Sequence, residues 1–177
     1  TLTLKSATFA QGRQMGKTLI LPVRWNLATA KPVLGINPAE KLLTNGIRGS
    51  LKYSDFEWCS WTNNDSVSFT IDLLKPEVLN TLTLGCITNN GMAIHKPASV
   101  KVEVSDDNSN FREAAMQSFT PEEIFREGNF IENLPLKLGG TQGRYVRVSA
   151  KGPGVCPASH VRSGQASRIF FDEVMLE

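Results

Sequence analysis

The sequence predicts an all-β protein, a β-sandwich or jelly roll built around one core, and three observations support this prediction. Several short segments alternate apolar and polar side chains with the period of two that is typical of β-strands. Loops rich in glycine, asparagine and proline separate these segments, and no long amphipathic helix occurs between them. Finally, 177 residues, of which 41% are hydrophobic and 20% charged, suffice for about one domain.

The clearest strand covers residues 66–71, where Val67, Phe69 and Ile71 alternate with hydroxyl-bearing residues. One face is therefore apolar and the other polar, as in an antiparallel strand that buries one face. The remaining strands of the sandwich are predicted at residues 79–87, 100–104, 129–138, 145–150 and 169–176.

Residues 1–22 are predicted to be two further strands, joined by a turn between Gly12 and Gly16. The letters GRQMGKT in this turn resemble a phosphate-binding loop, but the segment is too short for that motif and is better explained as a hairpin turn. Pro22 ends the pair, and the composition changes near residue 23. We therefore expect residues 1–22 to belong to a separate unit and residues 23–177 to form one domain.

One or two short helical turns are also expected. The segments NPAE at residues 37–40 and TPEE at residues 120–123 each combine an N-cap residue with proline at the first helical position and glutamate at the third. The second segment is stopped by Gly128, so it has room for only one or two turns.

The charge pattern excludes some partners. The net charge of +2 spreads over the chain without a basic stripe, so nucleic acid is not an expected partner. No apolar run reaches the roughly 18 residues of a membrane span, so no membrane partner is expected either. The chain begins at Thr1 without a signal peptide, and we expect it to be a piece of a longer protein whose targeting signal lies outside it.

The cysteines and histidines are few and widely spaced. Cys59, Cys86 and Cys156 form no CxxC pair, and only His95 and His160 accompany them, which disfavours a structural zinc site. An odd number of cysteines leaves at least one free thiol. Either Cys59 and Cys86 are bridged, or all three thiols are buried as small apolar groups.

The acidic residues do not form a catalytic pattern. The segment at residues 106–110 lacks the spacing and the terminal glutamate of an EF-hand, which predicts a hairpin turn. The pairs at residues 122–123 and 172–173 are adjacent in sequence, whereas a glycosidase holds two carboxyl groups about 5–9.5 Å apart across a cleft. The chain therefore lacks the carboxylate pair of a hydrolase, and binding is the better prediction.

Residues 43–50, LTNGIRGS, are compatible with an ordinary turn or with a loop that binds a hard cation. Gly46 and Gly49 allow tight folding that turns several carbonyl groups toward one point. The side chains of Asn45 and Ser50 add two oxygens. A calcium ion normally takes six to eight oxygens including a carboxylate, so a carboxylate from elsewhere is needed.

Several segments in order resemble an F5/8 type C, or discoidin, domain over residues 26–177: LTNGIRGS, VSFTIDL, the segment from ITNNGMAIHKP to SDDNSNF, RYVRVSAKG and RIFFDEVMLE. The pieces NLATAKPV, TPEEIFREGNFIENL and GPGVCPASHVRSGQASRIFFDEV more closely resemble a family 32 carbohydrate-binding module. Such modules lie at the C-terminus of chitobiase-like family 20 β-N-acetylhexosaminidases of Bacteroides-type bacteria. The resemblance implies a discoidin-like jelly-roll β-sandwich that binds glycans without catalysis.

The first residues, TLTLKSATFAQGRQMGKT, resemble the last strands of the small β-domain that precedes the module in such enzymes. The resemblance implies that the catalytic domain and its Asp–Glu pair lie upstream of this chain. It also implies that the parent protein is periplasmic, cell-surface or secreted.

The resemblance implies one structural calcium ion. Its ligands would be side-chain oxygens of Asn45, Ser50 and Glu173 and carbonyl oxygens of Leu43, Ile47 or Arg48. Family members usually carry an aspartate where this chain has Asn45, so a sodium ion or a water molecule is the alternative occupant.

The resemblance also implies a glycan site built from loops, with an aromatic face for the sugar ring and polar groups for its hydroxyls. Trp58 stands at the family's core position, which leaves Tyr53 and Trp61 as the aromatic candidates, with core packing as the alternative for each. The polar candidates are Asn89, Asn90, His95, His160 and Arg162. The expected partner is a Gal- or GlcNAc-terminated glycan.

Three functions remain open from the sequence. The first is a glycan-binding module appended to a hexosaminidase. The second is a structural domain that packs on the catalytic domain without a ligand, which the lack of an aromatic residue around Met92 favours. The third is membrane or protein adhesion through apolar loop tips such as Phe56 and residues 92–94.

Overall fold

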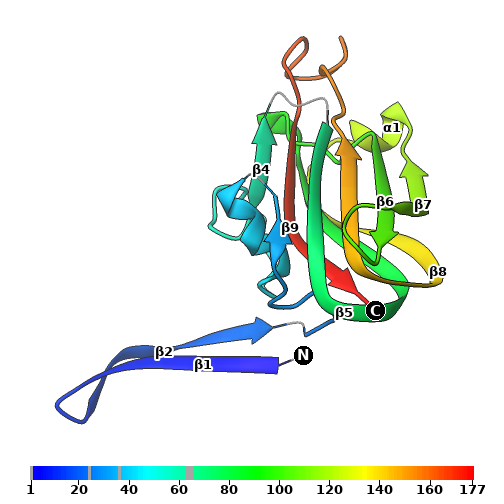
Figure 1. Ribbon diagram of the computed structural model, residues 1–177. Helices are drawn as coiled ribbons and strands as arrows, with labels where there is room; N and C mark the ends of the chain where they lie inside the picture. The colour runs from blue at the N-terminus through cyan, green and yellow to red at the C-terminus, as the bar shows by residue number, and fades with distance from the viewer. Residues whose placement is uncertain (1, 24, 36, 63–65) are drawn as a thin grey trace.

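A computed structural model describes residues 2–23, 25–35, 37–62 and 66–177 of the chain. Strands make up 57% of the structure and helices 8%, and the sheets are antiparallel, which confirms the predicted all-β class and the discoidin-like sandwich. Figure 1 shows the sandwich with a separate two-stranded hairpin beside one of its ends. No helix among the described residues is both long and apolar enough to cross a membrane.

Two long strands, β5 (Ser66–Asn89) and β8 (Asn129–Lys151), run antiparallel along both layers of the sandwich. In one layer the paired stretch includes Val67 opposite Ala150, and in the other layer it includes Leu84 opposite Leu134. The pairing shifts between Asp72 and Glu77, where both strands turn from one layer into the other. The sandwich is thus one continuous bent sheet whose ends face each other.

The shorter strands complete the two layers. In the first layer, β8 pairs with β6 (Ser99–Ser105), β6 pairs with β7 (Arg112–Ser118), and β5 pairs with β3 (Val33–Leu34). In the second layer, β5 pairs with β9 (Arg168–Leu176), and β9 pairs with β4 (Cys59–Thr62).

The apolar faces predicted from the sequence meet in the core. Val67, Phe69 and Ile71 of β5 are buried, as are Val102 of β6 and Val148 of β8, which pair with each other. Burying one such side chain contributes about 1.5–3 kcal/mol. A second, smaller cluster lies apart from this core and contains Trp58, Ile87, Ile94 and Phe170.

The helical turns are short, as predicted. The 3-10 helix η1 covers Pro38–Thr44 and is capped by Asn37, whose side chain accepts a hydrogen bond from the Ala39 N–H. The helix α1 covers Pro121–Ile124 and has a complete capping box between Thr120 and Glu123. A third turn, η2, covers Asn90–Met92 at the end of β5.

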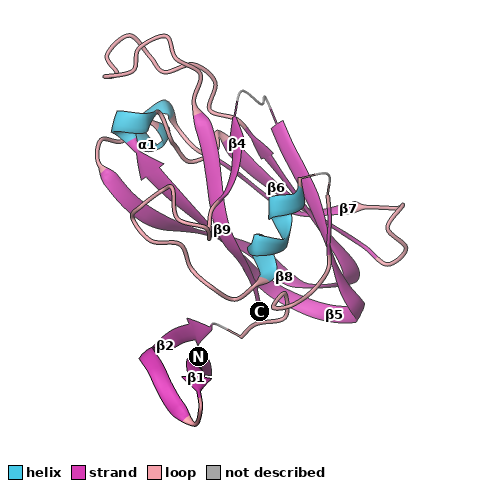
Figure 2. Cartoon of the chain, turned by 90° about the vertical axis from the view of Figure 1, so that its left-hand side faces the viewer, coloured by secondary structure: helices cyan, strands magenta, loops and turns pink. Residues whose placement is uncertain are grey.

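The N-terminal hairpin consists of β1 (Leu2–Ala10) and β2 (Arg13–Val23). Its turn is formed by Gln11 and Gly12, which both have positive φ angles, so it is tighter than predicted and β2 runs through Gly16. The views of Figures 1 and 2 agree that the hairpin projects away from the sandwich. Its exposed apolar residues are Leu4, Phe9, Met15, Leu19 and Ile20.

The start and the end of the sandwich lie side by side. The Leu27 N–H donates to the Leu176 carbonyl over 3.1 Å, and the Leu176 N–H donates to Oδ1 of Asn26 over 3.1 Å. Residues 89–98, α1 and residues 152–167 lie at the opposite end, which we call the loop end (Figure 1). The loop end is therefore free of the chain termini.

The three cysteines are buried free thiols, so the structure supports unpaired thiols rather than the Cys59–Cys86 bridge. Cys59 and Cys86 pack in the main core, where burial raises the pKa of Cys59 to about 12. Cys156 lies in the loop before β9.

Candidate functional site

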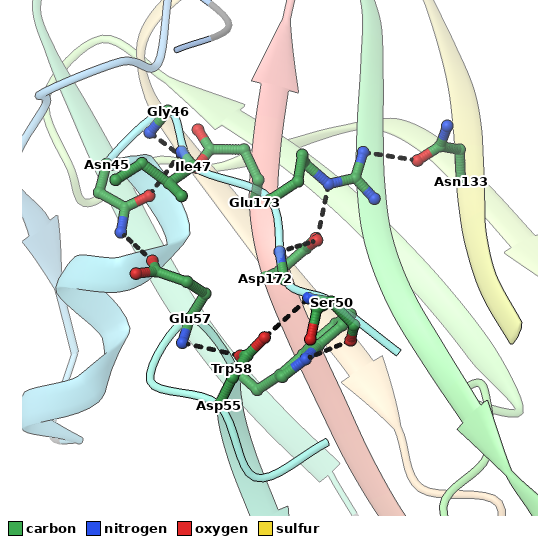
Figure 3. Close-up of polar contacts among 12 residues, drawn as sticks. Asn45, Gly46, Ile47, Ser50, Asp55, Glu57, Trp58, Asn133, Asp172 and Glu173 are labelled. Carbon is green, nitrogen blue, oxygen red and sulfur yellow. Dashed lines mark hydrogen bonds and ion pairs between the residues drawn. The ribbon is translucent and has the colours of Figure 1, made fainter. Parts of the chain in front are cut away.

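The predicted cation loop is anchored on two adjacent carboxylates of β9 (Figure 3). Leu84 pairs with Val174 and Cys86 with Phe171, so Asp172 and Glu173 both stand opposite Gly85 in a β-bulge. A Cβ atom at Gly85 would overlap Oδ1 of Asp172. The bulge therefore requires glycine opposite it and turns two carboxylates toward the same loop.

Both carboxylates accept hydrogen bonds from the loop. Oε2 of Glu173 accepts from the Gly46 N–H over 2.9 Å. Oδ2 of Asp172 accepts from the Gly49 N–H over 2.9 Å and from Nε of Arg48 over 2.6 Å. The Arg48 guanidinium thus places a positive charge beside the buried Asp172 carboxylate.

The rest of the loop is held by its own side chains. Oδ1 of Asn45 accepts from the Ile47 N–H, and the Asn45 amide donates to Glu57, each over 2.8 Å. The carboxylate of Asp55 accepts from the N–H groups of Ser50 and Glu57, and the Trp58 indole donates to the Ser50 carbonyl over 3.0 Å. Trp58 is buried against the loop, as the resemblance implied.

Glu173 is the carboxyl group of this site whose ionised form is disfavoured. Burial raises the pKa of its carboxyl to about 8, and repulsion by Asp172 adds to the shift. The Gly46 N–H, the Arg48 charge and the Asn26 side chain oppose it without cancelling it. Without further positive charge, this carboxyl is largely protonated at neutral pH.

The predicted calcium ligands have other bonds in this arrangement. Oxygens of Asn45, Glu173 and Ser50 each accept a backbone N–H, the last from Lys52 over 3.1 Å. The Arg48 side chain pairs with Asp172, and the Leu43 side chain packs in the core. A cation would have to replace some of these bonds, and the calcium site stays a prediction.

Three of the predicted sugar ligands are buried, Trp61, His95 and His160, and the assignment of the first two needs correction. Trp61 is only 9% exposed, because its ring stacks on Phe69 at 6.3 Å and meets Phe171 at 5.5 Å. It is a core residue and cannot form a platform for a sugar. His95 is 0% exposed, with its ring against Phe125, so it cannot touch a ligand at the surface.

Asn90, His160 and Arg162 do come together at the loop end. Nε2 of His160 lies 3.0 Å from Oδ1 of Asn90, and Nε of Arg162 donates to the Gly91 carbonyl over 2.7 Å. Arg162 is exposed, Asn90 is half-buried, and His160 is mostly buried beneath them. Asn89 is half-buried at the end of β5, where its backbone pairs with that of Ile94.

Tyr53 lies over the second apolar cluster. Its ring meets Phe170 edge-on at 6.2 Å, and Tyr53 and Met92 both pack on this cluster. The sequence offered no signal for a further partner, Arg168, whose guanidinium donates to the Met92 carbonyl over 2.6 Å and lies over the Phe170 ring. We call the exposed or half-buried group of Tyr53, Asn90, Met92 and Arg162 the loop-end face.

The sequence analysis also overlooked a cleft at the other end. It has a volume of about 310 Å³ and is lined by Trp25, Asn26, Leu27, Thr29, Lys31, Glu77 and Leu176. It lies where the start and the end of the sandwich meet, and Trp25 is exposed there. None of the predicted sugar ligands lines this cleft.

The chain is similar to known domains. Residues 32–163 match the family model of the F5/8 type C domain. The module CpGH89CBM32-6 produced by Clostridium perfringens has a TM-score of 0.54 and 17% identity, over 86% of this chain and 98% of that one. The module CpGH89CBM32-4 of the same organism, solved with GlcNAc-α-1,4-galactose, has a TM-score of 0.51 and 17% identity over 86% and 94% of the two chains.

A third similar structure is a mutant of the lectin binding domain of Lectinolysin in complex with Lewis b. Its TM-score is 0.55 at 16% identity, over 88% of this chain and 97% of that one. At such low identity these likenesses establish the fold alone. No curated protein matches the chain in sequence.

Proposed function

Because the chain belongs to the F5/8 type C domain family, we propose that it is a non-catalytic carbohydrate-binding module that holds Gal- or GlcNAc-terminated glycans on its loop-end face. The observations that carry the proposal are that Tyr53 and Met92 pack on one apolar cluster and that Arg162 bonds the carbonyl of Gly91, the residue before Met92. Sugar recognition needs both apolar and hydrogen-bonding groups in one shallow site.

Each residue of the loop-end face has a role in this proposal. The Tyr53 ring and Met92 offer apolar surface to the C–H groups of a sugar ring. Arg162 has five N–H donors, one of which bonds the Gly91 carbonyl, and the Asn90 amide nitrogen can donate to a hydroxyl. His160 supports the site from below by holding Oδ1 of Asn90.

Similar structures support a glycan as the ligand class. One of them was solved with GlcNAc-α-1,4-galactose and another with Lewis b. Both share the sandwich fold of this chain. We extend only the ligand class to this chain, with Gal or GlcNAc as the proposed terminal sugar.

The proposed role is to anchor a β-N-acetylhexosaminidase of the chitobiase type from a Bacteroides-type bacterium to its substrate. The exposed apolar side chains of the hairpin, among them Phe9 and Ile20, suit packing within a preceding small domain, which would include residues 1–22 and follow the catalytic residues in the sequence. Tethering raises the effective concentration of glycan near the active site. Such a protein would work in the periplasm, at the cell surface or after secretion.

A structural calcium ion at residues 43–50 is a further part of the proposal. Glu173 supports it, because a divalent cation would supply the charge that this buried carboxylate lacks. In that case calcium raises the melting temperature of the chain but not that of Glu173→Gln. If calcium changes the melting temperature of neither protein, the calcium claim is removed, and Arg48 is the cation that completes the loop.

A glycan array tests the proposed function. The wild-type chain should bind Gal- or GlcNAc-terminated glycans reproducibly. Tyr53→Ala and Arg162→Ala should each weaken the signal at least tenfold, since each removes contacts to one sugar. Phe56→Ala is the matched control, because this aromatic residue is 92% exposed and lies outside the loop-end face. A silent array would overturn the proposal in favour of a structural domain that packs on its enzyme.

A further inference from the structure

We propose that His95, Cys156 and His160 form a binding site for a divalent metal ion of the zinc type. His95 is far in the sequence from Cys156 and His160, yet the fold brings one ligand atom of each to within 4.8 Å of the others, and all three are buried. In a tetrahedral zinc site the nitrogen and sulfur ligands lie about 2.0–2.3 Å from the metal. The ligand atoms are then roughly 3.5 Å apart, so small side-chain rotations would complete the site.

His95 provides the first argument for a ligand. It is fully buried, yet neither of its ring nitrogens makes a hydrogen bond of ordinary geometry with a described residue. Its ring stands at 78° to that of His160, with the centroids 4.9 Å apart. The backbone of Ile124 can serve one ring nitrogen, which leaves the other buried without a partner. Such a group is costly, and a metal ion would provide its partner.

His95 is also in the protonation state that a metal needs. Burial lowers the pKa of His95 to about 4, and repulsion by His160 contributes, while the backbone of Ile124 opposes the shift. The imidazole is therefore neutral at pH 7 and keeps a lone pair for a metal ion.

His160 is already oriented by its neighbours. The Arg162 N–H donates to Nδ1 of His160 over 2.9 Å, so this nitrogen carries a lone pair. Nε2 then carries the proton and donates to Oδ1 of Asn90 over 3.0 Å. A metal bound at Nδ1 would replace the Arg162 N–H, and the bond to Asn90 would remain as the outer support that metal-bound histidines usually have.

Cys156 supplies the third ligand and makes the site selective. Its Sγ lies 3.4 Å from Oγ of Ser167, and no disulfide occupies it. One thiolate and two imidazoles favour zinc over magnesium or calcium, which prefer oxygen ligands. The fourth position is left for water or for the Ser167 hydroxyl.

The metal would join two parts of the loop end. His95 follows β5, whereas Cys156 and His160 belong to the segment before β9. This segment is already closed by hydrogen bonds between the backbones of Cys156 and Gln165 and of Cys156 and Gly164. Most of its residues between Pro157 and Ala166 are exposed, which gives an ion a route to the site.

Titration of the chelator-treated chain with Co²⁺ tests this inference without reference to glycan binding. We expect one Co²⁺ per chain, a thiolate-to-cobalt charge-transfer band in the absorption spectrum, and displacement by Zn²⁺ but not by Ca²⁺. Zn²⁺ should also raise the melting temperature. A saturated chain without the charge-transfer band, or no saturable binding, would overturn the proposal.

Two sets of variants test whether the Cys156 thiolate produces the charge-transfer band. Cys156→Ala should lose it, whereas Cys59→Ala, which removes a buried thiol outside the cluster, should keep it. The double variant Cys59→Ala/Cys86→Ala, in which Cys156 is the last thiol, must also keep the band, and this test holds even if Cys156→Ala fails to fold. His160→Gln should weaken Co²⁺ binding at least tenfold. A band that survives in folded Cys156→Ala would refute the site.

Discussion

At the scale of single residues, the structure buries two ionisable groups, Glu173 and His95. Burial disfavours the charged form of each, so their pKa values shift in opposite directions. Burial raises the pKa of the Glu173 carboxyl to about 8 and lowers that of His95 to about 4. Both lie where loops cover the sandwich. At each place a bound cation or metal ion would change the balance between the protonated and the deprotonated form. The pH dependence of the stability of the chain can therefore reveal whether a cation binds at these groups.

Glu173 should make the metal-free chain less stable as the pH rises. An unfolded glutamate loses its proton near pH 4.5, whereas the folded carboxyl keeps its proton up to about pH 8. The unfolded state thus releases its proton first, and the free energy of unfolding falls between these two pH values, by roughly 5 kcal/mol at most. Urea unfolding at pH 5 and pH 8 with a chelator measures the fall, which Glu173→Gln should remove. The same slope in both proteins would disprove this origin.

Arg48 should matter far more than a surface arginine. Arg48→Met would leave the fully buried Asp172 carboxylate without its charge partner, which costs about 3–5 kcal/mol. The matched control is Arg112→Met, because Arg112 pairs with Asp106 at the surface and such pairs contribute about 0–1 kcal/mol. Chemical denaturation of the two variants provides the comparison. Equal losses would show that the Arg48–Asp172 pair has no special role.

Sequence reasoning located part of this site and missed the rest for a physical reason. Asn45 and Gly46 predict a tight turn, and the resemblance implied that Glu173 contributes a carboxylate to this loop. The pairing of Arg48 with Asp172 depends on a bulge opposite Gly85, and a bulge is a property of strand register that a single strand does not display. Likewise, Trp61 and Tyr53 look alike in sequence, and only the packing of the sheets buries the first.

At the scale of elements, most strands were predicted, but their continuity was not. Pro76 and the pair Gly139–Gly140 look like breaks in the sequence, yet β5 and β8 stay paired with each other on both sides of the bend. The strand β7 escaped prediction because REAAMQS has little apolar alternation, and its burial is accordingly partial. β4 is only four residues long, too short for a periodic pattern.

The hairpin should be dispensable for the sandwich. Among the described residues, β1 and β2 pair only with each other, and the side chains of Leu4, Phe9, Met15, Leu19 and Ile20 are exposed. Deleting residues 1–22 should leave the melting temperature within about 2 °C of the wild-type value, because no core contact is lost. A scanning calorimetry comparison measures it. A drop of more than about 5 °C, which corresponds to roughly 1–2 kcal/mol for a domain of this size, would show that the hairpin belongs to the sandwich.

At the scale of the whole molecule, the fold separates two ends with different surroundings. The start and the end of the sandwich meet at one end, together with the hairpin and the cleft around Trp25. The loop end carries the loop-end face and, beneath it, the cluster of His95, Cys156 and His160. The all-β class was predictable from alternation alone, whereas these two groupings join residues from distant loops.

Mapping of backbone amide chemical shifts by NMR during titration with a GlcNAc- or Gal-terminated disaccharide tests the central claim most directly. Glycan binding at the loop-end face predicts that the shifts cluster at residues 52–54, 89–93 and 160–163, with the rest of the sandwich unmoved. Shifts confined to the cleft around Trp25, or a spectrum that does not change at millimolar sugar, would contradict the account.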